Sequence, residues 1–187
     1  MKSKYILVVL CITLLITACS SVGPTIRSNF NSSVDFNQYK TFGFFQKLDT
    51  DYRYESLTSQ FLKDATIVEM TKRGFTFTKD APDVLINFHN TVESKQDVRQ
   101  RPTVSYGRSY RYHKRIYYDA RIGYETYTHN YKKGTLSIDM VDRQQNKVIW
   151  EGVAEERLTK EELKNLQSTL QKSVAEIFAQ FPISTTP

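Results

Sequence analysis

The chain has 187 residues, of which 40% are hydrophobic and 25% are charged, and its formal net charge is +6. A chain of this length suits a single domain that buries a hydrophobic core of its own. Its two cysteines, Cys11 and Cys19, both lie near the start of the sequence, so the rest of the chain has no thiol for a disulfide, a metal site or a catalytic nucleophile.

Residues 1–18 are predicted to form a signal peptide that is cleaved from the protein. Lys2 and Lys4 give the segment a positive start, and an apolar run of twelve residues follows from Tyr5 to Ile16. This run is shorter than the about 20 apolar residues of a membrane-spanning helix and is typical of the core of a signal peptide.

The end of this segment, Leu15–Cys19 (LITAC), resembles a bacterial lipobox, in which small residues precede a lipidated cysteine. We therefore expect Cys19 to carry the lipid that anchors the protein; an ordinary secretory signal with a free Cys19 is the alternative. Ser20 stands where an Asp tends to hold such proteins at the inner membrane, and it favours the cell outer membrane. After the lipidated cysteine, residues 19–33 lack periodicity and are predicted to form a tether to a domain that faces the periplasm.

Three segments in the first half of the domain are predicted to be strands. Residues 34–45 (VDFNQYKTFGFF) are expected to form the first, because their Tyr, Thr and Phe residues favour extended backbone. Phe75–Thr78 alternates as a short strand, and Asp83–Val92 alternates over a longer distance after a turn.

A helix is predicted between the first two of these strands, over Tyr54–Arg73. Gly74 follows it at the C′ position, where glycine readily adopts the left-handed conformation that ends a helix. Four apolar residues at helical spacing are expected to form its buried stripe: Leu57, Phe61, Ala65 and Val68.

The stretch Gly134–Gly152 (GTLSIDMVDRQQNKVIWEG) predicts a hairpin. Its first half alternates apolar and polar residues, as a half-buried strand does, and the polar residues 143–146 are expected to form the turn. On the returning strand, Val148 and Trp150 are expected to share the buried face, with Ile149 on the other face. Trp150 is therefore predicted to be a core residue.

A second helix is predicted after this hairpin. It begins with a capping box, Thr159–Glu162, in which the Thr hydroxyl and the Glu carboxylate bind each other's free backbone amides. Pro182 is expected to end it. Its apolar stripe is formed by Leu163, Leu166, Leu170, Val174, Ile177 and Phe181.

These elements predict an α+β fold for a single domain, residues 34–182. We expect a two-layer sandwich in which an antiparallel sheet of four to five strands is covered on one face by two helices. The helices need the sheet to bury their stripes, and a two-stranded hairpin is at best marginal in water without further cover.

A long basic and tyrosine-rich segment, residues 94–133, separates two of the predicted strands. It holds ten Lys or Arg residues against three Asp or Glu, a net charge of +7, together with eight of the twelve tyrosines. A link of this length without clear periodicity is uncommon in a compact domain. We interpret it as an extended loop, or as a hairpin that continues the neighbouring strands and pairs near its two ends.

Several short motifs occur along the domain: Tyr39–Phe42 (YKTF), Ala81–Asp83 (APD), Gly134–Asp139 (GTLSID), Asp142, Trp150–Gly152 (WEG) and Phe181–Pro182 (FP). Together they resemble the bacterial lipoprotein family called domain of unknown function 4136, over nearly the whole of residues 34–182. Phe44 departs from the pattern, in which a Trp is expected. The resemblance implies an envelope lipoprotein with a compact α+β domain, and it supplies no catalytic residues.

The basic segment is also where we expect a binding site. Arginine binds phosphate or carboxylate groups through two parallel hydrogen bonds, and tyrosine supplies flat contact area while losing little side-chain entropy. The predicted anionic-surface site comprises Arg108, Arg111, Lys114, Arg115, Arg121, Tyr110 and Tyr112. Its partners would be lipopolysaccharide phosphates, lipid head groups or an acidic protein, and not nucleic acid; the alternative is a solvated segment without a ligand.

The sequence offers little for catalysis. The three histidines form no recognisable metal set, and Asp139 and Asp142 are expected on opposite faces of a strand. We predict no catalytic residue, metal or cofactor, and hence no enzyme. The expected function is that of a structural or assembly accessory of the cell envelope that contacts an envelope protein. The alternative is a binding module for an anionic envelope component such as lipopolysaccharide.

Overall fold

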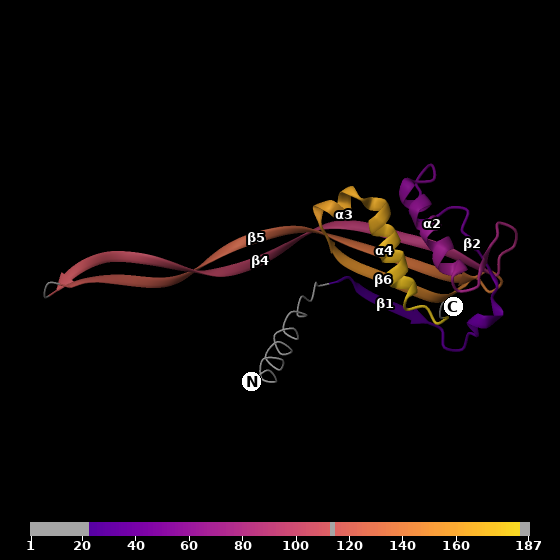
Figure 1. Cartoon of the computed structure of the whole chain (residues 1–187), viewed down its shortest axis with the longest axis horizontal. Coiled ribbons are helices and arrows are strands. Elements are labelled where there is room, and N and C mark those ends of the chain that lie inside the picture. Colours follow the sequence, from indigo (N-terminus) through magenta and orange to yellow (C-terminus); the bar gives the residue numbers. More distant parts are fainter. Residues whose placement is uncertain (1–22, 113–114, 184–187) are drawn as a thin grey trace, which may run out of the picture.

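In the computed structural model of the protein, the described residues are 23–112 and 115–183 (Figure 1). The predicted signal peptide, residues 1–18, and the predicted lipidation site, Cys19, lie outside these ranges. The elements are, in chain order, β1 (Thr25–Phe30), η2 (Phe36–Gln38), β2 (Thr41–Phe44), α2 (Leu57–Thr71), β3 (Thr76–Phe77), β4 (Val84–Tyr112), β5 (Arg115–Asp142), β6 (Lys147–Leu158), α3 (Lys160–Lys164) and α4 (Leu166–Phe178). Among the described residues, no helix is long and apolar enough to cross a membrane.

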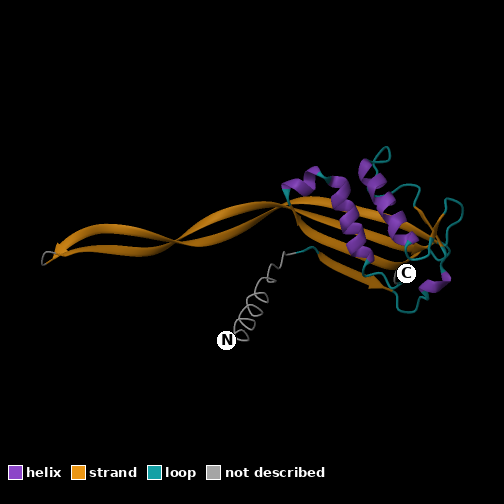
Figure 2. Ribbon diagram, in the orientation of Figure 1, coloured by secondary structure: helices purple, strands orange, loops and turns teal. Residues whose placement is uncertain are grey.

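Within these residues, six strands form one sheet in the order β1-β6-β5-β4-β2-β3. The helices α2 and α4 lie side by side on one face of it (Figure 2). β2 runs parallel to β3 and β4 because α2 carries the chain back along the sheet, and the other pairs are antiparallel. The predicted mixed α+β class is confirmed, whereas the sheet is larger than four or five strands and is not purely antiparallel.

Part of the predicted tether is a strand at the edge of the sheet. β1 pairs with β6 from Thr25↔Glu155 to Phe30↔Trp150, so the tether prediction is wrong for residues 25–30. The segment has one aliphatic residue, Ile26, which is too weak a pattern to signal a strand; backbone pairing to β6 holds it in place. The predicted first strand, residues 34–45, instead divides into η2 and the shorter β2.

The first predicted helix is present as α2, but it buries a different face. It begins after the N-cap Ser56, and Gly74 follows it with a left-handed φ of 83°, as predicted. Leu57 and Val68 of the predicted stripe are 64% and 53% exposed. The buried residues of α2 are Ser59, Leu62, Ala65, Thr66, Glu69 and Met70. Half of them are polar, which is why a search for apolar spacing missed this face.

The second predicted helix is present in two pieces. The capping box is confirmed, because the Thr159 hydroxyl accepts from the Glu162 amide (3.2 Å) and the Thr159 amide donates to the Glu162 carboxylate (2.8 Å). Asn165 interrupts the helix, and α4 ends at Phe178, before Pro182. The predicted stripe is buried at Leu170, Val174, Ile177 and Phe181, and exposed at Leu163 and Leu166.

The hairpin of β5 and β6 forms as expected, with its turn at residues 143–146. The register shifts after the pair Met140↔Trp150, which makes Ile149 a bulge residue. Ile149 and Trp150 are therefore both buried and Val148 is exposed, so the predicted sharing of a face by Val148 and Trp150 is wrong. The prediction that Trp150 is a core residue is confirmed, since none of its surface is exposed.

Candidate functional site

The most unusual feature of the molecule is a hairpin that extends far beyond the domain (Figure 1). β4 and β5 pair from Val84↔Asp142 to Tyr112↔Arg115, whereas β2 accompanies β4 only as far as Ile86 and β6 accompanies β5 only as far as Lys132. Beyond these points, β4 and β5 are paired with each other and with no other strand of the described residues. We call residues 95–112 and 115–131 the projecting hairpin. The hairpin interpretation of the basic segment is confirmed, but pairing runs along its length and is not limited to its ends.

Strand alternation sorts the side chains of the projecting hairpin onto two faces, because successive residues point to opposite sides. One face, which we call the uncharged face, consists of Gln96, Val98, Gln100, Pro102, Val104, Tyr106, Ala120, Ile122, Tyr124, Thr126, Thr128 and Asn130. The opposite face, which we call the basic face, consists of Lys95, Asp97, Arg99, Arg101, Thr103, Ser105, Arg121, Gly123, Glu125, Tyr127, His129 and Tyr131. The segment looked aperiodic in sequence because charges and apolar residues interleave at every second position.

All twelve residues of the uncharged face are exposed. Its five largest apolar side chains, Val98, Val104, Tyr106, Ile122 and Tyr124, are between 54% and 76% exposed. Four of them lie together at three successive cross-strand pairs, Pro102↔Tyr124, Val104↔Ile122 and Tyr106↔Ala120, whereas Gln100, Thr126 and Thr128 separate Val98 from this group. A cluster of exposed apolar side chains marks interaction sites more often than the single apolar residues scattered over most protein surfaces.

The basic face is linked internally by ion pairs and cation–π contacts. Arg101 donates to Glu125 at 2.8 Å, and Arg157, at the end of β6, donates to Asp97 at 2.8 Å. The Arg157 guanidinium also lies 3.9 Å from the centre of the Tyr131 ring. The hydrogen bond from Arg157 holds the pKa of the Asp97 carboxyl below its usual value. These contacts tie the base of the projecting hairpin to the domain.

The predicted anionic-surface residues fall into three groups. The backbone of Arg108, Tyr110, Arg111, Tyr112 and Arg115 occupies the far end of the projecting hairpin, where Tyr112 pairs with Arg115. Arg121 lies nearer the domain, on the basic face opposite Ser105. Lys114, the third group, lies outside the described residues.

Three of the sequence motifs, Tyr39–Phe42, Ala81–Asp83 and Asp142, lie at the other end of the sheet, where they hold strand ends together. The Tyr39 hydroxyl donates to the Asp142 carboxylate at 2.8 Å, and Asp83 accepts from the backbone amides of Lys40 and Thr41, both at 2.8 Å. Burial, followed by the hydrogen bond to Asp142, raises the pKa of Tyr39 to about 12. The contacts of these residues are therefore structural.

Close packing requires a glycine at position 152. A Cβ atom there would lie 2.6 Å from the Trp150 ring and would also overlap Ile177 of α4. Glycine thus allows the helix and the indole to pack directly on the strand.

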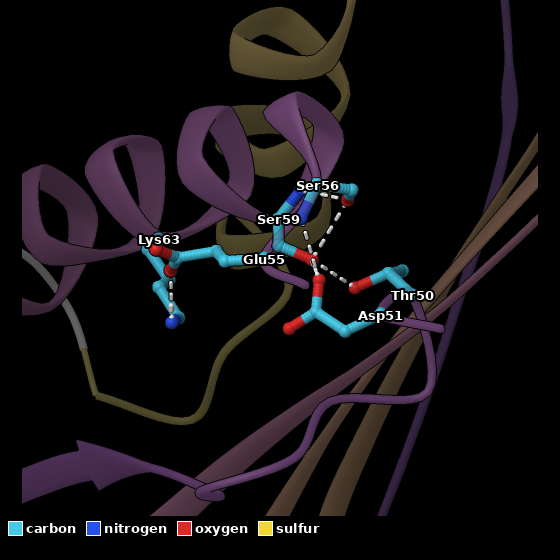
Figure 3. A network of polar contacts seen from close by, with 6 residues as sticks. All are labelled: Thr50, Asp51, Glu55, Ser56, Ser59 and Lys63. Carbon is cyan, nitrogen blue, oxygen red and sulfur yellow. Dashed lines mark hydrogen bonds and ion pairs between the residues drawn. The ribbon is translucent and has the colours of Figure 1, made fainter. Parts of the chain in front are cut away.

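A second polar cluster lies at the start of α2 (Figure 3). Asp51 accepts from the Ser56 amide at 2.9 Å and from the hydroxyl of the buried Ser59, which also contacts the Thr50 hydroxyl at 2.6 Å. Burial raises the pKa of Asp51, but the hydrogen bonds from Ser59 and Ser56 outweigh it, and the net shift is downward. The Ser56 hydroxyl also accepts from the Ser59 amide at 3.0 Å, so these contacts cap the first turn of α2.

Asp139 and Asp142 do not form a dyad. Asp139 lies on the sheet face opposite the helices, where burial and the charge of Glu151 raise its pKa, whereas Asp142 is bound to Tyr39. Within residues 23–112 and 115–183, no group of three or more His, Cys, Asp or Glu side chains could hold a metal ion.

A six-stranded mixed sheet with helices on one face and a projecting hairpin defines the class: an α+β domain with one long extension. The chain belongs to the family described as Domain of unknown function (DUF4136), whose model matches residues 26–183. The family resemblance of the sequence motifs is thereby confirmed. The curated proteins include no match to this chain.

Two solved structures are similar to this chain to different degrees. A PDZ domain protein from Parabacteroides distasonis ATCC 8503 is 17% identical, with a TM-score of 0.55 over 95% of this chain and 40% of that one. This chain therefore spans less than half the length of that protein. A variant of PelC from Paraburkholderia phytofirmans, solved as a dodecamer, is 9% identical, with a TM-score of 0.44 over 83% of this chain and 95% of that one. Identities this low concern the fold alone.

Proposed function

We propose that the protein is a lipoprotein of the cell outer membrane, facing the periplasm, that acts as a non-catalytic structural or assembly accessory of the envelope. In this proposal the domain is a rigid base and the projecting hairpin is the contact surface. The observation that carries the proposal is that residues 95–112 and 115–131 pair only with each other, outside the domain, with two chemically different faces.

The energetics of a hairpin support a contact role. A two-stranded hairpin is marginally stable in water, since each ordered residue costs about 1–2 kcal/mol of backbone entropy and little apolar surface is buried in return. No helix or strand among the described residues lies against the uncharged face, although the same side of β4 and β5 within the domain is covered by α2 and α4. A binding partner would supply the missing burial.

A shortened variant tests the proposal. Residues 96–130 are replaced by Asn-Gly, which forms a two-residue hairpin turn, so that Lys95 and Tyr131 remain paired. Wild-type and shortened proteins are then purified from detergent-solubilised envelopes. We expect the wild type to retain a stoichiometric protein partner that the shortened variant lacks, while the fluorescence of Trp150 reports an intact core in both. Recovery of the same partners by both proteins would refute the proposal.

The second candidate function is a binding module for an anionic envelope component. It is favoured by the basic face, on which Arg99, Arg101 and Arg121 lie in alternation along two strands. Here the co-purified species would be lipopolysaccharide or another acidic lipid. Replacing Arg99, Arg101 and Arg121 with Ser would release it, and added salt would weaken it because the attraction fades within about 8 Å at physiological ionic strength. Capture of a protein that survives these substitutions would exclude this candidate.

A further inference from the structure

We propose that the uncharged face of the projecting hairpin binds the same face of a second copy of this chain. The inference rests on the proposed function, because it names the partner of one surface of the hairpin. It predicts an isologous pair in which the same residues meet from both chains.

The uncharged face is continuous and long. It runs over eleven residues of each strand, about 36 Å at a rise of about 3.3 Å per residue, and none of its twelve residues is charged. Toward the domain the pair Ser94↔Lys132 ends this face, because the Lys132 ammonium donates to the Ser94 hydroxyl at 2.6 Å. A small hollow of about 50 Å³ lies beyond that pair, lined by Val92, Leu158, Leu163 and Leu166 among others, and it is separate from the uncharged face.

The twist of the hairpin makes a second hairpin a better binding partner for the uncharged face than a flat surface would be. β4 and β5 cross over each other midway along the projection (Figure 1), as expected for a two-stranded ribbon, which twists more strongly than a wide sheet. The uncharged face therefore turns along its length, so a planar membrane would meet only part of it. A second hairpin of the same twist can follow it throughout.

Charge selects which faces meet. The basic face carries Lys95, Arg99, Arg101 and Arg121 against Asp97 and Glu125, so two basic faces brought together would repel each other. When two copies meet through their uncharged faces, no charged residue of either face is buried, and both basic faces remain exposed to water. Pairing of the two copies therefore removes no charged group of these faces from water.

The outer edge of β4 disfavours growth of the sheet by edge pairing. The Phe45 amide donates to the Ile86 carbonyl, so the backbone groups of every second residue from Ile86 onward point away from β5. Pro102 is one of these residues and has no N–H to donate. A partner strand on this edge would lose a hydrogen bond at its middle, which makes pairing along β4 less favourable.

The expected interface is small. A strip of about 36 Å by 10 Å on each copy would bury roughly 700 Å² of surface in total, if the strip is treated as flat. This buried area is below the about 1,000–1,200 Å² that is typical of stable complexes. We therefore expect a dissociation constant in the micromolar range.

The full chain, purified in detergent, is examined by sedimentation equilibrium from about 1 to 100 µM. The wild type is expected to pass from one to two chains per particle. The variant V104E/I122E places two charges at a cross-strand pair of the uncharged face and should weaken association at least tenfold. The matched control T103E/S105E places two charges on the basic face, beside the same positions, and should leave association within about threefold of the wild type. Trp150 fluorescence verifies the core of each variant.

A wild type that stays monomeric throughout this range would overturn the inference, as would equal weakening by both variants. A monomer that binds anionic vesicles through Val104 and Ile122 would assign the face to a membrane instead. The results distinguish the two proposals. If the wild type is monomeric and the shortened variant loses the envelope partner, only the pairing of two copies is refuted. If the wild type dimerises and the shortened variant keeps the same envelope partners, only the accessory role is refuted.

Discussion

The Tyr39 hydroxyl donates a 2.8 Å hydrogen bond to the carboxylate of Asp142, across 103 residues of sequence, and both side chains are buried. The other Asp142 oxygen accepts from the backbone amides of Gln144 and Gln145, each at 2.8 Å. One carboxylate thus joins the chain before β2 to the turn between β5 and β6. These hydrogen bonds stabilise the end of the sheet that lies opposite the projecting hairpin.

Removing the hydroxyl should weaken the domain measurably. Tyr39→Phe leaves the ring in place and deprives a buried carboxylate of one donor, which typically costs about 1.5–3 kcal/mol for a hydrogen bond to a charged group. Urea unfolding followed by Trp150 fluorescence measures the loss. Tyr54→Phe, at a tyrosine that is 81% exposed, is the control and should stay within about 0.5 kcal/mol of the wild type. Equal stability of Tyr39→Phe and the wild type would mean that water replaces the donor.

The same contact predicts a loss of stability in alkali. Burial and Asp142 raise the pKa of Tyr39 to about 12 in the folded protein, against 10.0 for an ordinary tyrosine. A group whose pKa is raised on folding contributes stability fully below its unfolded pKa and loses it as the pH rises through the folded value. The stability difference between wild type and Tyr39→Phe should therefore be constant between about pH 6 and 10, where Asp142 stays ionised, and shrink between about pH 10 and 12. A difference that is flat across this window would show that the phenol titrates normally.

The strong patterns of the sequence predicted their elements, and the failures have physical causes. The capping box at Thr159 and the left-handed Gly74 are local features, so short stretches of sequence suffice to identify them. β1 was missed because edge pairing stabilises it rather than an apolar face of its own. The buried face of α2 was misjudged because Ser59 and Glu69 are buried with hydrogen-bond partners.

The candidate surface was only half predictable. The basic and tyrosine-rich composition located it, but treating residues 94–133 as aperiodic concealed the period-2 alternation that separates Val104 from its neighbours Thr103 and Ser105. Its length as a hairpin depends on pairing between residues up to 58 positions apart, as in Val84↔Asp142, which no local pattern encodes. The bulge at Ile149, which places Val148 on the opposite face of the sheet from the one predicted, could likewise not be recognised from the sequence.

Trp150 should be the most costly single truncation in the core. Its ring stacks on Phe178 with centroids 5.4 Å apart and meets Phe181 edge-on at 5.1 Å. Trp150→Ala is expected to lower the free energy of unfolding by about 3–5 kcal/mol. Because this variant lacks the fluorophore, far-ultraviolet circular dichroism follows its unfolding in urea. Val148→Ala, at an exposed position of the same strand, is the control; a loss below about 1 kcal/mol for Trp150→Ala would contradict the core assignment.

The lipid anchor is predicted from residues that lie before the described domain. If Leu15–Cys19 is a lipobox, Cys19 carries the acyl chains, and growth with labelled palmitate should mark the wild type but not Cys19→Ser. Cys11→Ser, within the predicted signal peptide, is the matched control and should be labelled like the wild type. Label that persists in Cys19→Ser would exclude lipidation at this position.

Limited proteolysis should divide the chain in the projecting hairpin. Residues 94–133 hold ten Lys or Arg residues, and the hairpin has no core to resist local opening, so trypsin should cut there long before it cuts the domain. The two fragments should remain together on a native gel, because the inner parts of β4 and β5 stay paired from Val84↔Asp142 to Glu93↔Lys133. Pairing between copies would protect the hairpin, so cleavage should slow as protein concentration rises in the wild type and not in V104E/I122E. First cuts in the loop between β2 and α2, with the hairpin intact at low concentration, would contradict the expected ease of opening.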